Sequence, residues 1–127
     1  MSRLHVSSGS PWESRIGFSR ALRDRDLVFV SGTAPIWPDG SCPDDARTQA
    51  RRCLEIIEAA LRDAGASIAD VVRTRTYLTD ARDAEAVGEV HGEVFGEVRP
   101  ASTMVVVAAL LDPRWKVEIE ADARARP

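Results

Sequence analysis

The longest regular pattern of apolar residues in the sequence lies between Asp44 and Gly65. Apolar side chains recur there at steps of three and four residues, which places them on one face of an α-helix. They are Ala46, Ala50, Cys53, Leu54, Ile57, Ala60, Leu61 and Ala64. Carboxylates at Asp44 and Asp45 favour the positive end of a helix dipole, and a glycine suits the residue after the last turn. The pattern predicts an amphipathic helix over residues 44–64.

Shorter patterns before this helix predict an antiparallel meander. Residues 27–30 form an apolar, β-prone run that stops at Ser31-Gly32, and residues 17–23 are a candidate strand before it. The sequence Trp37-Pro38-Asp39-Gly40 predicts a tight turn, because proline presets φ and glycine accepts a positive φ. A third short strand could adjoin this turn.

Alternation of period two predicts three strands after the first helix, over residues 71–79, 102–110 and 116–123. In the first of these, one face carries Val72, Thr74, Thr76 and Leu78, and the other carries Arg73, Arg75 and Tyr77. In the last, Val117, Ile119 and Ala121 point inward, and Glu118, Glu120 and Asp122 point to the other side. A second helix is expected over residues 83–95, with Ala84, Val87, Val90, His91 and Val94 on its inner face. Two helices can cover only one face of such a sheet.

The uncovered face would mix the arginines and carboxylates with Met104 and Val106. A mixed face of this kind suggests burial against a second copy of the chain, so we expect a homo-oligomer. The alternative is a set of exposed cross-strand ion pairs, each contributing less than about 1 kcal/mol.

Length and charge narrow the class of protein. The 127 residues suit one domain, here residues 1–127, and are too few for two separate cores. A formal net charge of −3 gives no reason to expect nucleic-acid binding, since Arg51-Arg52 and the Arg73/Arg75 pair stand among acidic residues. We expect no signal peptide, because residues 1–9 have no apolar core of sufficient length. We expect no membrane span, because the longest apolar run, 104–111, is too short. The cytoplasm is the expected location.

The residues that could hold a metal or form a disulfide are few. Cys42 lies among turn-forming residues and Cys53 on the apolar face of the predicted helix, so we expect no disulfide between them. His5 and His91 stand at no spacing typical of metal ligands. The sequence therefore predicts no metal site. His91, on the inner helix face, is more typical of a core or interface histidine than of a proton shuttle.

Several short motifs follow one another in an order typical of a known family. They are residues 26–32 (DLVFVSG), Gln49, 65–67 (GAS), 70–74 (DVVRT), 79–80 (TD), 99–105 (RPASTMV) and 117–121 (VEIEA). Together they span nearly the whole chain. In this respect the chain resembles the RidA/YjgF family of reactive intermediate deaminases.

The resemblance implies a fold, an assembly and an activity. The fold is the chorismate-mutase-like α+β fold, a six-stranded mixed sheet backed by two helices on one face, assembled as a homotrimer with ligand clefts between subunits. In the best-understood members an arginine holds the carboxylate of a short imino acid. A glutamate and a water then hydrolyse the C=N bond to a keto acid and ammonia, without a cofactor.

Part of the family's site is retained. The resemblance places the catalytic glutamate at Glu118, and it implies that the Gly32 backbone holds ligand oxygens. The competing interpretation of Glu118 is a structural ion pair with Arg73 or Arg75. Phe18 stands where the family often has a tyrosine that lines the cleft.

The carboxylate-binding part differs. Ser102 follows Pro100-Ala101, where the family has its arginine, and Met104 stands at the position of a nearby cysteine. A serine provides no positive charge, although Ser102 or Thr103 could donate a hydrogen bond to a ligand. Arg99 could act as a substitute or could be an ordinary surface arginine.

Two functions of different classes remain. The first is a cofactor-independent hydrolase that acts on an imine, enamine or related small reactive metabolite, with specificity altered by Ser102. The alternative is a non-catalytic trimer that binds a small metabolite or a protein partner. The endoribonuclease activity attributed to some relatives is disfavoured by the acidic charge balance.

Overall fold

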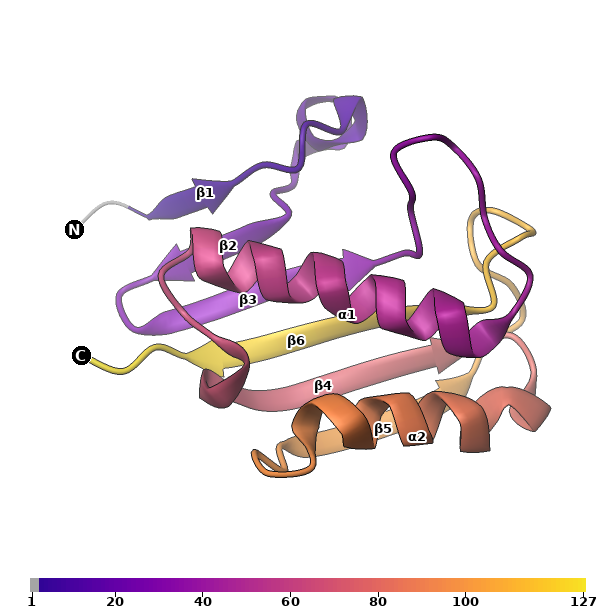
Figure 1. The fold of residues 1–127 in the computed structure, drawn as a ribbon. Helices are drawn as coiled ribbons and strands as arrows, with labels where there is room; N and C mark the ends of the chain where they lie inside the picture. Colours follow the sequence, from indigo (N-terminus) through magenta and orange to yellow (C-terminus); the bar gives the residue numbers. More distant parts are fainter. Residues whose placement is uncertain (1–2) are drawn as a thin grey trace.

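Six strands form one mixed sheet in the order β1-β2-β3-β6-β4-β5, and two helices cover one of its faces (Figure 1). The structure is a computed structural model that describes residues 3–127. The strands are β1 Leu4–Val6, β2 Ala21–Asp24, β3 Leu27–Thr33, β4 Val71–Leu78, β5 Ala101–Val106 and β6 Val117–Arg124. The helices are α1 Ala46–Asp63 and α2 Ala84–Phe95, with short helical turns η1 Glu13–Gly17, η2 Ile68–Asp70 and η3 Ala81–Asp83. The predicted α+β fold is confirmed.

The central strand β6 has the predicted alternation. Val117, Ile119 and Ala121 are at most 1% exposed beneath the helices, and the three acidic residues between and after them point to the uncovered face. β6 pairs antiparallel with both β3 and β4. Only β4 and β5 run parallel, because α2 crosses over between them.

Helix α1 lies where its apolar stripe predicts, and both of its ends are capped. The Asp45 carboxylate accepts a hydrogen bond from the Thr48 amide at 3.0 Å. After the last turn, Gly65 has a φ of +79° and the Ala66 amide bonds back to the Leu61 carbonyl at 2.8 Å, which is a Schellman ending. Arg23 from β2 adds a charged hydrogen bond at 2.8 Å to the carbonyl of Ala64.

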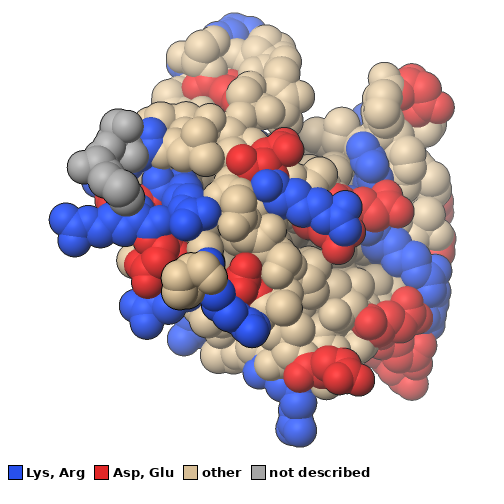
Figure 2. Space-filling view, turned by 60° about the vertical axis from the view of Figure 1, so that its left-hand side comes forward, with Lys and Arg blue, Asp and Glu red and all other residues tan. Residues whose placement is uncertain are grey.

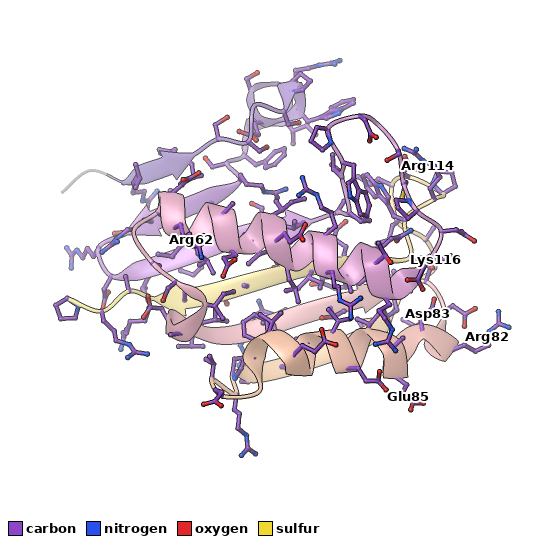
Figure 3. All side chains as sticks on the ribbon, viewed as in Figure 1. Arg62, Arg82, Asp83, Glu85, Arg114 and Lys116 are labelled. Atoms are coloured by element: carbon purple, nitrogen blue, oxygen red, sulfur yellow. The ribbon has the colours of Figure 1, made fainter. Side chains whose placement is uncertain are left out.

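Helix α2 packs beside α1 and completes the core. Val87, Val90 and Phe95 are fully buried. On the outside of the helix pair, Arg47 bonds to Glu89 at 2.7 Å, an exposed contact that contributes little. Charged side chains also project from the end of the molecule where both helices begin, among them Arg82, Asp83, Glu85, Arg114 and Lys116 (Figure 3).

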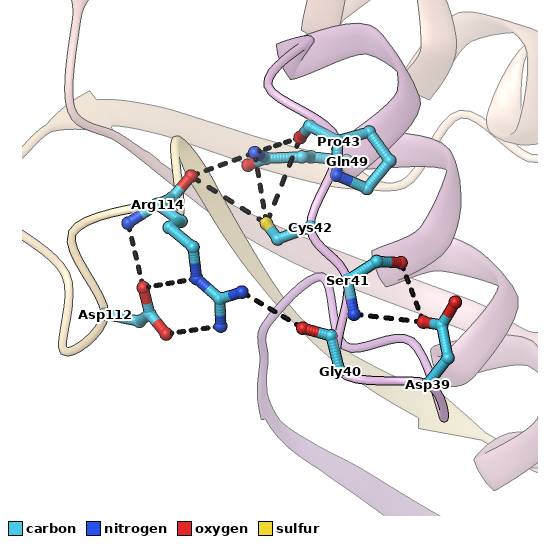
Figure 4. Close-up of polar contacts among 8 residues, drawn as sticks. All are labelled: Asp39, Gly40, Ser41, Cys42, Pro43, Gln49, Asp112 and Arg114. Carbon is cyan, nitrogen blue, oxygen red and sulfur yellow. Dashed lines mark hydrogen bonds and ion pairs between the residues drawn. The ribbon is translucent and has the colours of Figure 1, made fainter.

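A buried amide joins α1 to two loops (Figure 4). The Gln49 Nε2 donates to the carbonyls of Pro43 at 2.8 Å and Arg114 at 3.0 Å, and its Oε1 accepts from the Lys116 amide at 2.7 Å. The Arg114 guanidinium in turn donates to the Gly40 carbonyl at 3.0 Å. These bonds hold the 34–45 and 107–116 loops together at the end of β3 and the start of β6.

Several predicted boundaries were wrong. Residues 13–17 form a helical turn, so the strand expected over 17–23 begins only at Ala21. The turn at Trp37–Gly40 is confirmed by a 3.0 Å bond between those two residues, but no strand adjoins it. The sixth strand is instead β1, at the N-terminal end of the described residues. The strand expected over 102–110 ends at Val106, because the chain leaves the sheet after the Val107 amide bonds to Leu78.

Three predicted side-chain directions were also wrong. A register shift between Val71 and Arg73 buries Val71 and leaves Val72 53% exposed, so Val72 does not share the face of Thr74. Met104 pairs with Thr76 in parallel register and therefore points to the helix side. Val106, opposite Leu78, does the same. On β5 the uncovered face therefore carries Thr103 and Val105 in place of Met104 and Val106.

No helix within residues 3–127 is long and apolar enough to cross a membrane. The same residues contain no group of His, Cys, Asp and Glu side chains placed to hold a metal ion. Cys42 and Cys53 are both free thiols.

Candidate functional site

Glu118 is the second residue of β6, and the alternation of that strand places its side chain on the uncovered face. The side chain is half-buried and forms no ion pair within residues 3–127. Burial raises the pKa of Glu118 above its ordinary value, and Arg20 opposes this shift more weakly. A carboxylate with a raised pKa and no fixed partner is suited to accept and return a proton.

The structure decides against the ion-pair interpretation of Glu118. Arg75 instead approaches Asp122 at 3.4 Å and Glu120 at 3.9 Å. The Tyr77 hydroxyl donates to Glu120 in a short hydrogen bond, which raises the pKa of Tyr77. These neighbours satisfy one another and leave Glu118 out of their network.

Gly32 lies directly against the Glu118 carboxylate. β3 bulges between Val30 and Thr33, so that its pairing with β6 shifts by one residue there. A Cβ on Gly32 would overlap the Glu118 Oε2 and lie 3.3 Å from its Cδ. A side chain at position 32 would therefore displace the Glu118 carboxylate, although the backbone itself, whose φ is not positive, does not demand glycine.

Arg20, immediately before β2, also contacts Gly32, at its carbonyl group. Its Nη2 donates to the Gly32 carbonyl at 2.6 Å, and its guanidinium lies 5.9 Å from the centre of the Phe18 ring. Burial lowers the pKa of Arg20, while Glu13 and Glu118 act in the opposite direction. Arg20 was not predicted from the sequence, because a lone arginine before a strand offers little signal of function.

Phe18 follows η1 and borders a hollow of about 430 Å³ on the uncovered face. Other residues that line this hollow include His5, Ser19, Ser31 and Glu120. Phe18 is 37% exposed, which is consistent with the predicted role as an apolar wall. Gly32 and Glu118 do not line this hollow, but they are in contact with each other, and Arg20 connects Gly32 to Phe18.

The remaining predicted residues lie elsewhere in the same chain. In the parallel register Ser102 is opposite Thr74 and points to the helix side, as Met104 does. The Ser102 Oγ lies 2.8 Å from the Thr74 Oγ, which lies 2.8 Å from the His91 Nε2. Ser102 and Met104 therefore do not meet Glu118 within one chain.

Thr103, on the edge strand β5, and Arg99, just before it, are placed differently from Ser102 and Met104. Thr103 is opposite Arg75 and faces the uncovered side. Arg99 has a left-handed φ of +53°. It lies just before the first residue of β5, Ala101, which pairs with Arg73 of β4. Gly32 lies toward the opposite end of the sheet, so Arg99 does not reach Glu118 in the same chain.

Burial lowers the pKa of His91, which also stacks against Phe95 with ring centres 4.7 Å apart. A half-buried neutral imidazole in a hydrogen-bonded chain agrees with the expected core or interface role.

The fold and this site define a class: a small α+β domain with a half-buried glutamate held against a glycine bulge on the uncovered face of its sheet. Comparison with known proteins supplies the family. The Endoribonuclease L-PSP family model matches residues 10–125. The crystal structure of Rv2704 from Mycobacterium tuberculosis, a YjgF/YER057c/UK114 family member, is 51% identical with a TM-score of 0.90, over 98% of this chain and 100% of that one. The chain therefore belongs to the RidA/YjgF family.

A second relative has a name that refers to activity. TdcF of Escherichia coli, named as a candidate reactive intermediate deaminase, is 37% identical over 102 residues, which is 76% of this chain and 78% of TdcF. The crystal structure of E. coli TdcF with bound serine has a TM-score of 0.81 and covers 96% of this chain and 94% of that one.

Proposed function

We propose that this protein hydrolyses the C=N bond of a small imine, or of an enamine in its imine form, without a cofactor. Water adds to the imine carbon, and the resulting amino alcohol loses ammonia to leave a carbonyl compound. Glu118 takes the proton from the attacking water and returns it to the departing nitrogen, so the glutamate is unchanged after each turnover. The name of TdcF supports the same reaction class.

The observation that carries this proposal is the state of the Glu118 carboxylate. It is half-buried, has a raised pKa and stands outside the ion-pair network of β4 and β6. A purely structural carboxylate on this strand is expected to pair as Asp122 does. The carboxylate also lies directly against Gly32, where the absence of a side chain leaves room for it.

We further propose a homotrimer in which the β5 edge of one subunit meets the Gly32–Glu118 region of the next. Ser102 lies on the wrong side of the sheet to reach Glu118 in its own chain, so a common cleft needs two chains. Exposed apolar side chains support contact at both surfaces: Val105 and Val106 on β5, and Phe29 on the uncovered face. The two free thiols are consistent with action in the reducing cytoplasm.

The first test is release of keto acid and ammonia from 2-iminopropanoate and 2-iminobutanoate, generated in the assay by an amino-acid oxidase. We expect turnover by the wild type and at least a 100-fold loss in Glu118→Gln, in line with the usual contribution of a general base. Ser102→Arg is the matched gain-of-charge variant. Activity that survives unchanged in Glu118→Gln would refute the assigned role.

Subunit mixing tests the shared cleft. Glu118→Gln removes one half of the proposed site and Ser102→Trp blocks the other, so each variant alone should be inactive. Co-assembled subunits should regain activity, because some clefts then combine an intact Glu118 with an intact Ser102. No recovery in verified mixed assemblies would contradict a cleft built from two chains.

The alternative is a non-catalytic trimer that binds a small metabolite, favoured by the engagement of the Ser102 hydroxyl with Thr74. Saturable binding of a keto acid with no turnover of any imine would support it. An RNA substrate is less favoured, because Lys and Arg are interspersed with Asp and Glu over the face in Figure 2 rather than forming one basic surface.

A further inference from the structure

Arg20 is a half-buried cation that lacks an ion-pair partner among residues 3–127. Its Nη2 donates to the Gly32 carbonyl at 2.6 Å, but its Nε is buried and has no hydrogen-bond partner in the described chain. The carboxylates that influence it, Glu13 and Glu118, lie beyond ion-pair distance. Glu13 is already engaged, because it accepts hydrogen bonds from the amide and hydroxyl of Ser8. Burial of a charged group costs free energy when one of its hydrogen-bond donors has no acceptor.

The position of the guanidinium relative to Glu118 indicates what kind of ligand it can hold. Arg20 contacts the carbonyl of Gly32, and Glu118 lies over the place where a Cβ of Gly32 would stand. The positive and negative groups therefore flank one glycine without touching each other. A small molecule with an anionic group next to an electrophilic carbon could place the anion on Arg20 and that carbon beside Glu118. Phe18 would cover the guanidinium on its apolar side.

We propose that Arg20 is the anion-binding residue of this site and holds a planar anion, such as the carboxylate of an α-imino acid, through its terminal nitrogens Nη1 and Nη2, because the buried Nε cannot be reached from solvent. A guanidinium binds a carboxylate in this two-bond geometry. Arg20 thereby provides the charge that Ser102 lacks, and it does so from the strand next to Gly32 rather than from β5. This inference rests on the proposed function for the identity of the substrate, but not for the binding of the anion.

Binding of a stable product analogue tests Arg20 separately from catalysis. The probes are 2-oxobutanoate and its uncharged amide, titrated into the assembled protein and followed by NMR. Arg20→Gln removes the charge, and its shorter side chain also loses the Nη2 bond to the Gly32 carbonyl. It should weaken 2-oxobutanoate binding by about 10- to 100-fold, the loss of one charged hydrogen bond. The affinity of Arg20→Lys for 2-oxobutanoate should fall between those of the wild type and Arg20→Gln. Binding of the amide should differ little between wild type and Arg20→Gln.

Two further variants provide the comparison. Arg25→Gln makes the same chemical change at the exposed β2–β3 turn and should leave binding unchanged. Arg99→Gln tests the substitute expected from the sequence. Equal affinity for 2-oxobutanoate in wild type and Arg20→Gln, no binding by the wild type, or loss only in Arg99→Gln would each overturn the assignment. Arg20→Gln could lose binding simply because it misfolds. Arg20→Lys, if its NMR spectrum is that of a folded protein, provides a second variant in which the effect on binding can be measured.

The outcomes separate this inference from the proposed reaction. Binding that depends on Arg20, with no turnover of any imine, would retain the anion site and refute the hydrolase. Turnover that is equally fast in wild type and Arg20→Gln would retain the hydrolase and refute the role of Arg20.

Discussion

Gly32→Ala should inactivate the protein while leaving it folded. The φ of Gly32 is not positive, so an alanine can adopt the same backbone. The three atoms nearest to the added Cβ all belong to the Glu118 side chain, and no backbone atom is among them. The substitution therefore acts on one flexible carboxylate and on little else.

The expected magnitudes differ for stability and activity. Alanine restricts the unfolded chain, which stabilises by about 0.4–1 kcal/mol. Displacement of Glu118 from its rotamer costs about 0.5–1.5 kcal/mol, so the free energy of unfolding should change by less than about 1 kcal/mol. The carboxylate oxygen must move by roughly 1 Å, and a shift of that size can reduce kcat/KM about 100-fold.

Three measurements check this. Chemical denaturation gives the change in stability, and imine hydrolysis gives kcat/KM. NMR titration should show the pKa of Glu118 moving down toward its ordinary value, because the displaced side chain is less buried. Gly92→Ala is the control, since nothing lies within 4 Å of its added Cβ and the residue is exposed in α2. It should raise stability by up to about 1 kcal/mol with unchanged activity.

A double-mutant cycle decides whether the effect passes through the carboxylate. In a Glu118→Gln background, Gly32→Ala should reduce activity little further. If the double variant loses activity by the product of the two single fold-losses, the effect of Gly32→Ala does not pass through Glu118. If Gly32→Ala retains full activity and an unchanged Glu118 pKa, the close approach has no functional role.

Four further outcomes follow from the same structure. Gln49→Leu should cost about 2–4 kcal/mol of stability, measured by urea unfolding, because it leaves buried backbone groups of two loops without partners. Glu118→Gln should be more stable than wild type at pH 7, since the native pKa is raised, and this advantage should vanish below about pH 4.5. Burial lowers the native pKa of His91, so its contribution to stability is present above about pH 6.5 and is lost as the pH falls. His91→Gln should therefore reduce the pH dependence of the free energy of unfolding in that range. In native protein a thiol reagent should modify Cys42 while Cys53 reacts only on unfolding, because Cys53 is fully buried.

Strong periodicity made parts of the fold predictable from sequence. The apolar stripe of α1 and the alternation of β6 each follow from the spacing of side chains in a regular element. The proposed role of Glu118 was predicted from the second of these patterns together with the family resemblance. The same reasoning failed at Val72, because a bulge interrupts the alternation without any signal in the residues themselves.

Other features depend on pairing, which no local pattern reveals. The side of the sheet that Ser102 faces is set by its parallel register with Thr74 rather than by its own strand. Arg20 is significant only because β2 and β3 place it next to the Gly32 carbonyl. These relations connect residues of different strands, so the sequence analysis could not place them.

The two bulges beside β6 bear on how this domain can change in length. An extra residue in a strand lets the chain gain or lose one position without turning every later side chain to the other face. Deletion of Val72 should therefore preserve the burial pattern of the rest of β4. Deletion of Ser31 would equally restore regular pairing in β3, but it would move Gly32 relative to Glu118. Insertions and deletions should thus be accepted at the β4 bulge and selected against at the β3 bulge.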